Sequence, residues 1–207
     1  MTKSQDTASP FLTSAQPDDA GVALLLVNLG TPTAPEPGPV RAFLREFLSD
    51  RRVIEMSPLL WKPILEGIIL RVRPREVAGK YRSIWMDEGS PLMHYTREQA
   101  RLLGERLPGA RVEVAMRYGQ PSIGSVLDRL YAEGVRRVAI LPAYPQYAAS
   151  TVATINDAVA RWIGRNRDGF ELRLHRSFPA APAYIEALAS ALERHWERVG
   201  RPNFLTG

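Results

Sequence analysis

The sequence predicts an α/β fold in which an open, mostly parallel sheet carries helices on both faces. The apolar run at 22–29 is continuous apart from Asn28, as expected for a strand buried on both faces of a parallel sheet. Two further short runs with β-branched residues, at 112–116 and 135–141, also predict strands. A fourth run, at 170–175, alternates more and predicts a further strand. Segments with helical spacing separate these runs, and such alternation of strand and helix is typical of parallel α/β sheets.

The helical segments show apolar residues three and four positions apart. This spacing occurs in 40–48, 100–107, 123–130, 155–163 and 185–192. The interval 53–88 interrupts the alternation of strands and helices, because it contains two apolar stretches with no strand between them. We expect two amphipathic helices there, joined near Pro74.

Composition excludes several classes of site. The chain has 207 residues and a formal net charge of +5, and it contains no cysteine, which excludes disulfides, thiolate metal sites and a cysteine nucleophile. Its three histidines, His94, His175 and His195, lack HExxH-type spacing, so no all-histidine metal site is expected. Residues 1–20 lack the pattern of a secretory signal, and we expect them to be a disordered polar leader. No apolar run is long enough to span a membrane, and a cytoplasmic location is expected.

Ligands of open α/β sheets bind outside the carboxyl ends of the strands. Three segments follow those ends and should converge: 28–32, 116–119 and 141–147. Arg117 supplies a cation, and Tyr118, Tyr144 and Tyr147 supply aromatic rings with hydroxyl groups. This chemistry suits a flat, apolar ligand that carries carboxylates.

Together these segments resemble the ferrochelatases, the enzymes that insert ferrous iron into protoporphyrin IX to make haem. The matching stretches are LVNLGTP at 26–32, YRSI at 81–84, GSPL at 89–92, MRYG at 116–119 and LPAYPQYAAST at 141–151. The resemblance implies two Rossmann-like, chelatase-type domains with a porphyrin cleft between them. On this chain, 21–168 would be the first domain and 169–207 the truncated start of the second.

The resemblance also implies roles for individual residues. The expected porphyrin wall consists of Leu29, Arg117, Tyr118, Tyr147, Ser150 and Thr151. The expected apolar lip of the cleft consists of Trp61, Ile64, Leu65 and Ile68, although these side chains fit a plain core nearly as well. Leu29 stands where some relatives have a tyrosine or methionine that contacts the metal, and leucine cannot ligate.

The family's metal-site histidine, in a Ser-Ala-His-Gly-type motif, and its downstream glutamate have no counterpart in residues 1–207. We therefore expect no catalytic residue and no metal ligand in this chain, with both lying beyond Gly207. Fe²⁺ is expected as a substrate, and no permanently bound cofactor is expected. The isolated chain should be weakly active or inactive.

Three functions remain at this point. The chain is part of a ferrochelatase, or an inactive porphyrin or metal carrier that keeps half of the cleft, or an α/β domain that binds nucleotides or nucleic acid. The absence of a GxGxxG or P-loop pattern after the first strand disfavours the third. We expect porphyrin and not nucleic acid as the partner. Peripheral membrane contact by the lip and the oligomeric state stay open.

Overall fold

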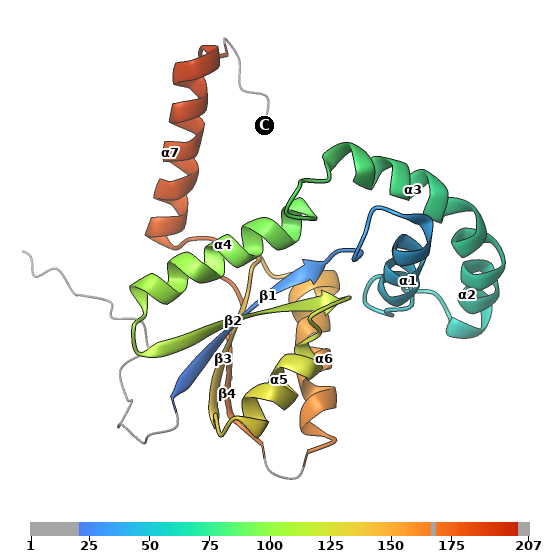
Figure 1. Cartoon of the computed structure of the whole chain (residues 1–207), viewed down its shortest axis with the longest axis horizontal. Helices are drawn as coiled ribbons and strands as arrows, with labels where there is room; N and C mark the ends of the chain where they lie inside the picture. The colour runs from blue at the N-terminus through green and yellow to red at the C-terminus, as the bar shows by residue number, and fades with distance from the viewer. Residues whose placement is uncertain (1–20, 167–168, 203–207) are drawn as a thin grey trace, which may run out of the picture.

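A computed structural model describes residues 21–166 and 169–202. Its centre is a four-stranded sheet in the order β2-β1-β3-β4, with every neighbouring pair parallel (Figure 1). The strands are β1 (Val22–Gly30), β2 (Ala110–Tyr118), β3 (Arg137–Pro142) and β4 (Glu171–Leu174). The α/β fold and the four strands predicted from the apolar runs are confirmed. The leader predicted at 1–20 lies outside the described residues.

Helices cover both faces of the sheet. On one face, α4 (Pro91–Arg106) packs against β1 and β2. On the other face, α5 (Ile123–Ala132) and α6 (Thr154–Ile163) enclose the main core with alternate residues of β1, among them Leu25 and Val27. The largest side chain in this core is that of Trp162, which is fully buried. The prediction of helices on both faces is therefore correct.

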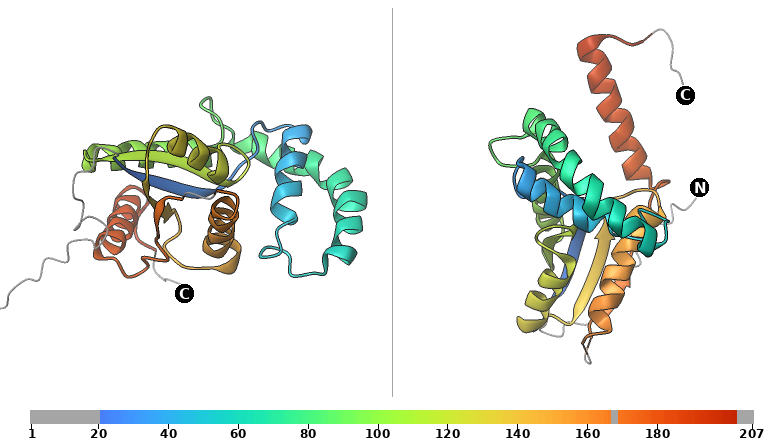
Figure 2. Two further views of the ribbon diagram at one scale, coloured as in Figure 1. Left: turned by 90° about the horizontal axis from the view of Figure 1, so that it is seen from below. Right: turned by 90° about the vertical axis from the view of Figure 1, so that its right-hand side faces the viewer.

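The fourth strand corrects the predicted division of the chain. β4 was expected to open a second domain, but it pairs with β3 in this same sheet. A boundary after residue 168 would cut through the sheet, because a short apolar run does not reveal which sheet its strand joins. Beyond β4, helix α7 (Pro182–Val199) projects away from the sheet and has no buried residue (Figures 1 and 2).

A helical arm stands beside the sheet and not on either face (Figure 1). It consists of α1 (Pro37–Leu48), α2 (Pro58–Ile64), a π-helical turn η1 (Leu65–Ile69) and α3 (Leu70–Ile84). We call residues 37–84 the lip segment. Among the described residues, no helix is long and apolar enough to cross a bilayer.

The predicted helix junction near Pro74 is wrong, because Pro74 lies buried inside α3. Proline there removes only the hydrogen bond to the first residue of that helix. The change in helix geometry occurs in η1, where the Leu70 amide donates to the Leu65 carbonyl. Residues five apart in an α-helix point about 140° apart, and the wider π turn instead lets both leucines face inward. Both are 2% exposed.

Candidate functional site

The carboxyl ends of β1 and β2 meet as predicted. Gly30 pairs with Tyr118 in the sheet register, and its φ of 115° is one that side-chain-bearing residues rarely adopt. A Cβ atom on Gly30 would lie 1.8 Å from the Tyr118 carbonyl oxygen. Glycine in the GTP stretch is therefore required by this close approach of two backbones. The loop after β3 joins the same edge through a 2.8 Å hydrogen bond from the Ala143 amide to the Val27 carbonyl.

A carboxylate that the sequence reasoning missed organises this edge. Asp50, just after α1, accepts hydrogen bonds on Oδ2 from Arg117 Nη2 at 2.5 Å, from the Tyr118 hydroxyl at 3.0 Å and from the Thr154 hydroxyl. Its Oδ1 accepts from the Arg52 amide at 2.8 Å. Arg117 Nε also donates to the Thr154 carbonyl and hydroxyl, at 2.9 and 2.6 Å. We call Asp50, Arg117, Tyr118 and Thr154 the Asp50 cluster.

The cluster sets the ionisation of its members. Burial alone would raise the pKa of Asp50, but the hydrogen bonds from Thr154, the Arg52 amide and Tyr118, with the charge of Arg117, lower it below its usual value. Burial raises the pKa of Tyr118 to about 12, with a further contribution from the adjacent Asp50 carboxylate. The cluster thus holds a carboxylate, a guanidinium and a neutral phenol.

This arrangement gives Arg117 and Tyr118 a different place from the expected ligand wall. Tyr118 is 0% exposed, so its ring offers no surface to a ligand in this fold. The Arg117 side chain is 9% exposed, and its guanidinium is already paired with Asp50. The guanidinium carbon lies 4.3 Å from the Tyr118 ring centroid, as in a cation–π contact. Both residues act as internal partners of Asp50.

The other predicted wall residues are accessible. Tyr147 is 43% exposed, and the Arg176 guanidinium lies 4.6 Å from its ring centroid. Leu29 is half-buried at the end of β1. Ser150 and Thr151 are half-buried in the π-helical turn η2 (Ala149–Ala153), which leads into α6.

Two buried hydroxyls at this edge have no hydrogen-bond partner among the described residues. They belong to Thr31, after β1, and Tyr144, after β3. Burial raises the pKa of Tyr144 above its ordinary value, with a further contribution from Tyr118. A buried hydroxyl without a partner is costly, so this edge has unused capacity to bond a ligand or water.

The predicted lip divides between surface and core. Ile64 and Ile68 are 36% and 59% exposed, whereas Leu65 is buried against the lip segment's own helices. The Trp61 indole nitrogen donates to the Leu48 carbonyl at 2.7 Å, which fixes that ring to the end of α1. The expectation that Leu65 faces a ligand is therefore not met.

The most exposed apolar side chains of the lip were missed. Leu59 is 86% exposed, and Leu60 and Val72 are each 66% exposed. Lys62 and Arg71 lie exposed on the same helices. For Leu59 and Leu60, the sequence signal was two adjacent leucines after Pro58, which do not fit the spacing of three and four residues that is typical of a buried helix face.

Asp50 and Thr154 were also missed, although signals for both were present. Thr154 follows the YPQY stretch at the start of α6, and Asp50 is the carboxylate that ends the Phe-Leu-Ser-Asp sequence after α1. Sequence spacing gives no indication that residues 50, 117 and 154 meet, because their separations depend on the crossover connections of the sheet.

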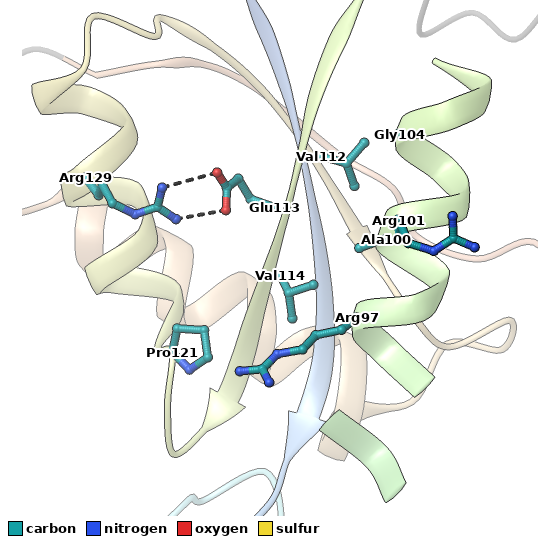
Figure 3. A pocket seen from close by; sticks show the side chains of 9 residues that line it. All are labelled: Arg97, Ala100, Arg101, Gly104, Val112, Glu113, Val114, Pro121 and Arg129. Carbon is teal, nitrogen blue, oxygen red and sulfur yellow. Dashed lines mark hydrogen bonds and ion pairs between the residues drawn. The ribbon is translucent and has the colours of Figure 1, made fainter. Parts of the chain in front are cut away.

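A separate hollow lies between α4, β2 and α5 (Figure 3). It measures about 460 Å³ and is lined by Arg97, Ala100, Arg101, Gly104, Val112, Glu113, Val114, Pro121 and Arg129. None of the predicted site residues lines it, and Arg129 donates to Glu113 across one side. Among the described residues, no group of three or more metal-ligating side chains is placed to hold an ion.

Comparisons with known proteins agree with the motifs at this edge. The family model described as Ferrochelatase matches residues 21–205. Proteins named ferrochelatase from Methylibium petroleiphilum and Azoarcus sp. are 51% and 49% identical over 86% and 90% of this chain. One from Bordetella pertussis is 47% identical over 95% of it. These alignments cover 50%, 52% and 56% of the relatives, so the chain spans about half their length.

Among solved structures, a CbiX protein of Marinobacter aquaeolei VT8, attributed to cobalamin (vitamin B12) biosynthesis, matches with a TM-score of 0.48 and 14% identity. The match covers 90% of this chain and 100% of that one, and at this score it supports no argument. The sequence comparisons do. Because the family model matches far more than half of the residues, the chain belongs to the ferrochelatase family.

Proposed function

We propose that this chain forms one wall of the porphyrin cleft of a ferrochelatase, which inserts Fe²⁺ into protoporphyrin IX in haem biosynthesis. The observation that carries the proposal is the family match over residues 21–205. The fold supports it, because the motifs of the matched segments gather at the carboxyl edge of the sheet, where α/β proteins bind ligands.

The accessible side chains suit a porphyrin. Tyr147 and Leu29 offer an aromatic ring and an aliphatic side chain after neighbouring strands, and the hydroxyls of Thr31 and Tyr144 lack partners. A mostly apolar surface with a few polar groups is typical of sites for flat organic ligands. Ile64 and Ile68 of the lip segment add exposed apolar surface.

Metallation itself requires more than this wall. Fe²⁺ must lose its water, the ring must bend, and a base must accept the two pyrrole protons. The described residues contain no metal-ligating cluster, and the carboxylate of Asp50 is committed to Arg117. We therefore propose that the 207-residue chain binds protoporphyrin and metallates it weakly or not at all.

Titration of the chain with protoporphyrin IX, followed by the Soret band, tests the binding. We expect saturable binding, and about a tenfold loss of affinity on Tyr147→Ala, the effect of losing one aromatic contact. Ile163→Ala is the matched control, because Ile163 is 43% exposed, like Tyr147, but ends α6 at the opposite end of that helix from η2. Absence of binding, or equal effects of the two substitutions, would contradict the proposed wall.

An assay of Fe²⁺ insertion tests the second half of the proposal. We expect little haem formation by the 207-residue chain at porphyrin concentrations that saturate it. Rates close to those of a full-length relative would refute the idea that the metal-handling groups lie elsewhere. Binding without metallation would favour the carrier function if it persisted in a fusion of this chain to the half of a relative that the alignments do not cover.

We also propose that the lip touches a membrane surface from the cytoplasmic side. Leu59, Leu60 and Val72 are exposed, and Lys62 and Arg71 lie on the same helices. Apolar side chains with nearby cations favour the surface of anionic lipid. Cell fractionation tests the location.

Sedimentation with anionic vesicles tests the surface contact. Leu59→Ser combined with Leu60→Ser should reduce binding, whereas Leu102→Ser, at an exposed position on α4, should not. Equal binding by both variants would refute the lip as the contact.

A further inference from the structure

We infer that residues 46–52, at the end of α1, form a clasp that sets the position of the lip segment against the carboxyl edge of the sheet. The inference concerns how this chain holds the lip. Its consequence for ligand binding rests on the function proposed above.

The Asp50 cluster is the first point of the clasp. Asp50 belongs to the lip segment, whereas Arg117 and Tyr118 end β2 and Thr154 begins α6. Three donors from two core elements converge on one carboxylate oxygen. The side chains of Arg117 and Asp50 are 9% and 10% exposed, so the pair is shielded from water. Hydrogen bonds to a charged group are stronger and more directional than neutral ones, especially when shielded.

Two further contacts flank this point. Arg52 makes a bidentate pair with Asp157 of α6, through Nε at 2.5 Å and Nη2 at 2.9 Å. On the other side, the Gly119 amide donates to Glu46 Oε2 at 2.8 Å. The Phe47 ring also packs edge-on against Tyr118, with centroids 5.1 Å apart.

The charges in the clasp alternate. The lip contributes an anion at Asp50 and a cation at Arg52, and the core contributes the opposite charges at Arg117 and Asp157. A shift that moved the lip by two residues would place like charges together. The arrangement therefore specifies one register of the lip on the core, as charge patterns do at protein interfaces.

The clasp is also the main attachment of the lip. Among the described residues, every side-chain hydrogen bond that joins residues 37–84 to β2, Gly119 or α6 involves Glu46, Asp50 or Arg52. Arg82 donates to Pro35, but that carbonyl lies in the loop that leads into the lip. Figure 1 shows the lip segment beside the sheet, and the ring contact of Phe47 with Tyr118 also lies within residues 46–52.

Asp50 is therefore a positioning residue. It does not face the ligand, and it determines where the exposed Ile64 and Ile68 stand relative to the edge that carries Leu29 and Tyr147. Loosening the clasp would leave the lip segment held only by its own contacts, including the Arg45–Glu66 pair, so that its helices would open to solvent more often.

Hydrogen–deuterium exchange of the 207-residue chain tests this directly. Asp50→Asn should raise amide exchange in 53–84 by at least about tenfold, the effect of losing one hydrogen bond to a charged group. Exchange in α5 should stay unchanged. Glu66→Gln is the matched control, because its partner Arg45 lies inside the lip segment.

A charge exchange provides a second test that does not touch the buried cluster. The Arg52 and Asp157 side chains are 41% and 39% exposed, so substitutions there should fold. Arg52→Asp alone should raise exchange in 53–84, and adding Asp157→Arg should restore it. Unchanged exchange in Asp50→Asn and Arg52→Asp, or failure of the second substitution to restore it, would overturn the clasp.

Porphyrin affinity measured on the same variants separates the clasp from the proposed function. We expect weaker binding in Arg52→Asp and recovery in the double variant. If exchange responds but porphyrin affinity does not, the clasp has no positioning role in binding and that part is refuted. If the unsubstituted chain binds no porphyrin, the proposed function fails, whereas the exchange data still decide the clasp.

Discussion

Replacing Arg117 with methionine should destabilise the fold, because it leaves the Asp50 carboxylate without its counter-ion. Methionine keeps most of the volume of the arginine stem and removes the charge and the donors to Asp50 and Thr154. Breaking a buried ion pair by removing one partner costs about 3–5 kcal/mol. Asp50 keeps three donors, from Tyr118, Thr154 and the Arg52 amide, so we expect the lower end, about 3 kcal/mol.

For a chain of this size, that loss corresponds to a decrease in Tm of about 6–12 °C. Urea denaturation at pH 7, followed by circular dichroism, measures the free energy of unfolding. Arg101→Met is the control, because Arg101 pairs with Glu98 and Glu105 on the exposed face of α4, and exposed pairs contribute at most about 1 kcal/mol.

The pH dependence provides an internal check. In the unsubstituted chain the pKa of Asp50 is lowered, so its contribution is present above the unfolded value of about 3.9 and is lost as the pH falls through the folded pKa. Without Arg117, the pKa of Asp50 should move up from its lowered value, because one of the groups that lower it is gone. The destabilisation should then stay constant from pH 7 to about 4 and shrink below it, where the carboxyl of the variant takes up a proton first.

Adding Asp50→Asn to Arg117→Met should recover part of the loss, since no unpaired charge then remains. A loss equal to that of Arg101→Met, or a loss independent of pH, would show that Asp50 does not depend on Arg117 for its charge.

Three further predictions concern the core and the strand ends. Gly30→Ala should destabilise by about 3 kcal/mol through strain and collision with the Tyr118 carbonyl, whereas Gly38→Ala, with nothing near its Cβ, should stay within about 1 kcal/mol; thermal melts compare the two. Trp162→Phe removes the 2.6 Å hydrogen bond from the indole nitrogen to Asp128 and should lower the free energy of unfolding, measured by urea denaturation, by about 2 kcal/mol. An unchanged free energy of unfolding would contradict a stabilising role for this hydrogen bond. Burial raises the pKa of Tyr118 to about 12, so its stabilising contribution should be lost as the pH rises from the unfolded pKa of about 10 through 12. Tyr118→Phe should make this decline in the free energy of unfolding shallower. A decline that is shallower in the unsubstituted chain than in the variant would contradict the prediction.

The sequence by itself determined the elements of the fold. Apolar runs marked β1 and β3, whose core-facing residues are buried, and the helical spacing of α5 and α6 marked the faces that enclose Trp162. The strand ends were predictable for the same reason, since parallel strands share one carboxyl edge. These features depend on neighbours along the chain and on a simple geometric rule.

Only the tertiary structure decided which side chains meet. Asp50 and Arg117 are 67 residues apart, and the pair depends on how α1 returns to the end of β2. The same packing turned Tyr118 inward and buried Leu65, and it placed β4 in the first sheet. Composition and periodicity describe the faces of single elements. The hydrogen-bond partner of a side chain, its burial and the sheet that a strand joins are decided when elements distant in the sequence pack together. The contacts that stabilise this packing are between residues far apart in the chain, and local sequence patterns do not specify them.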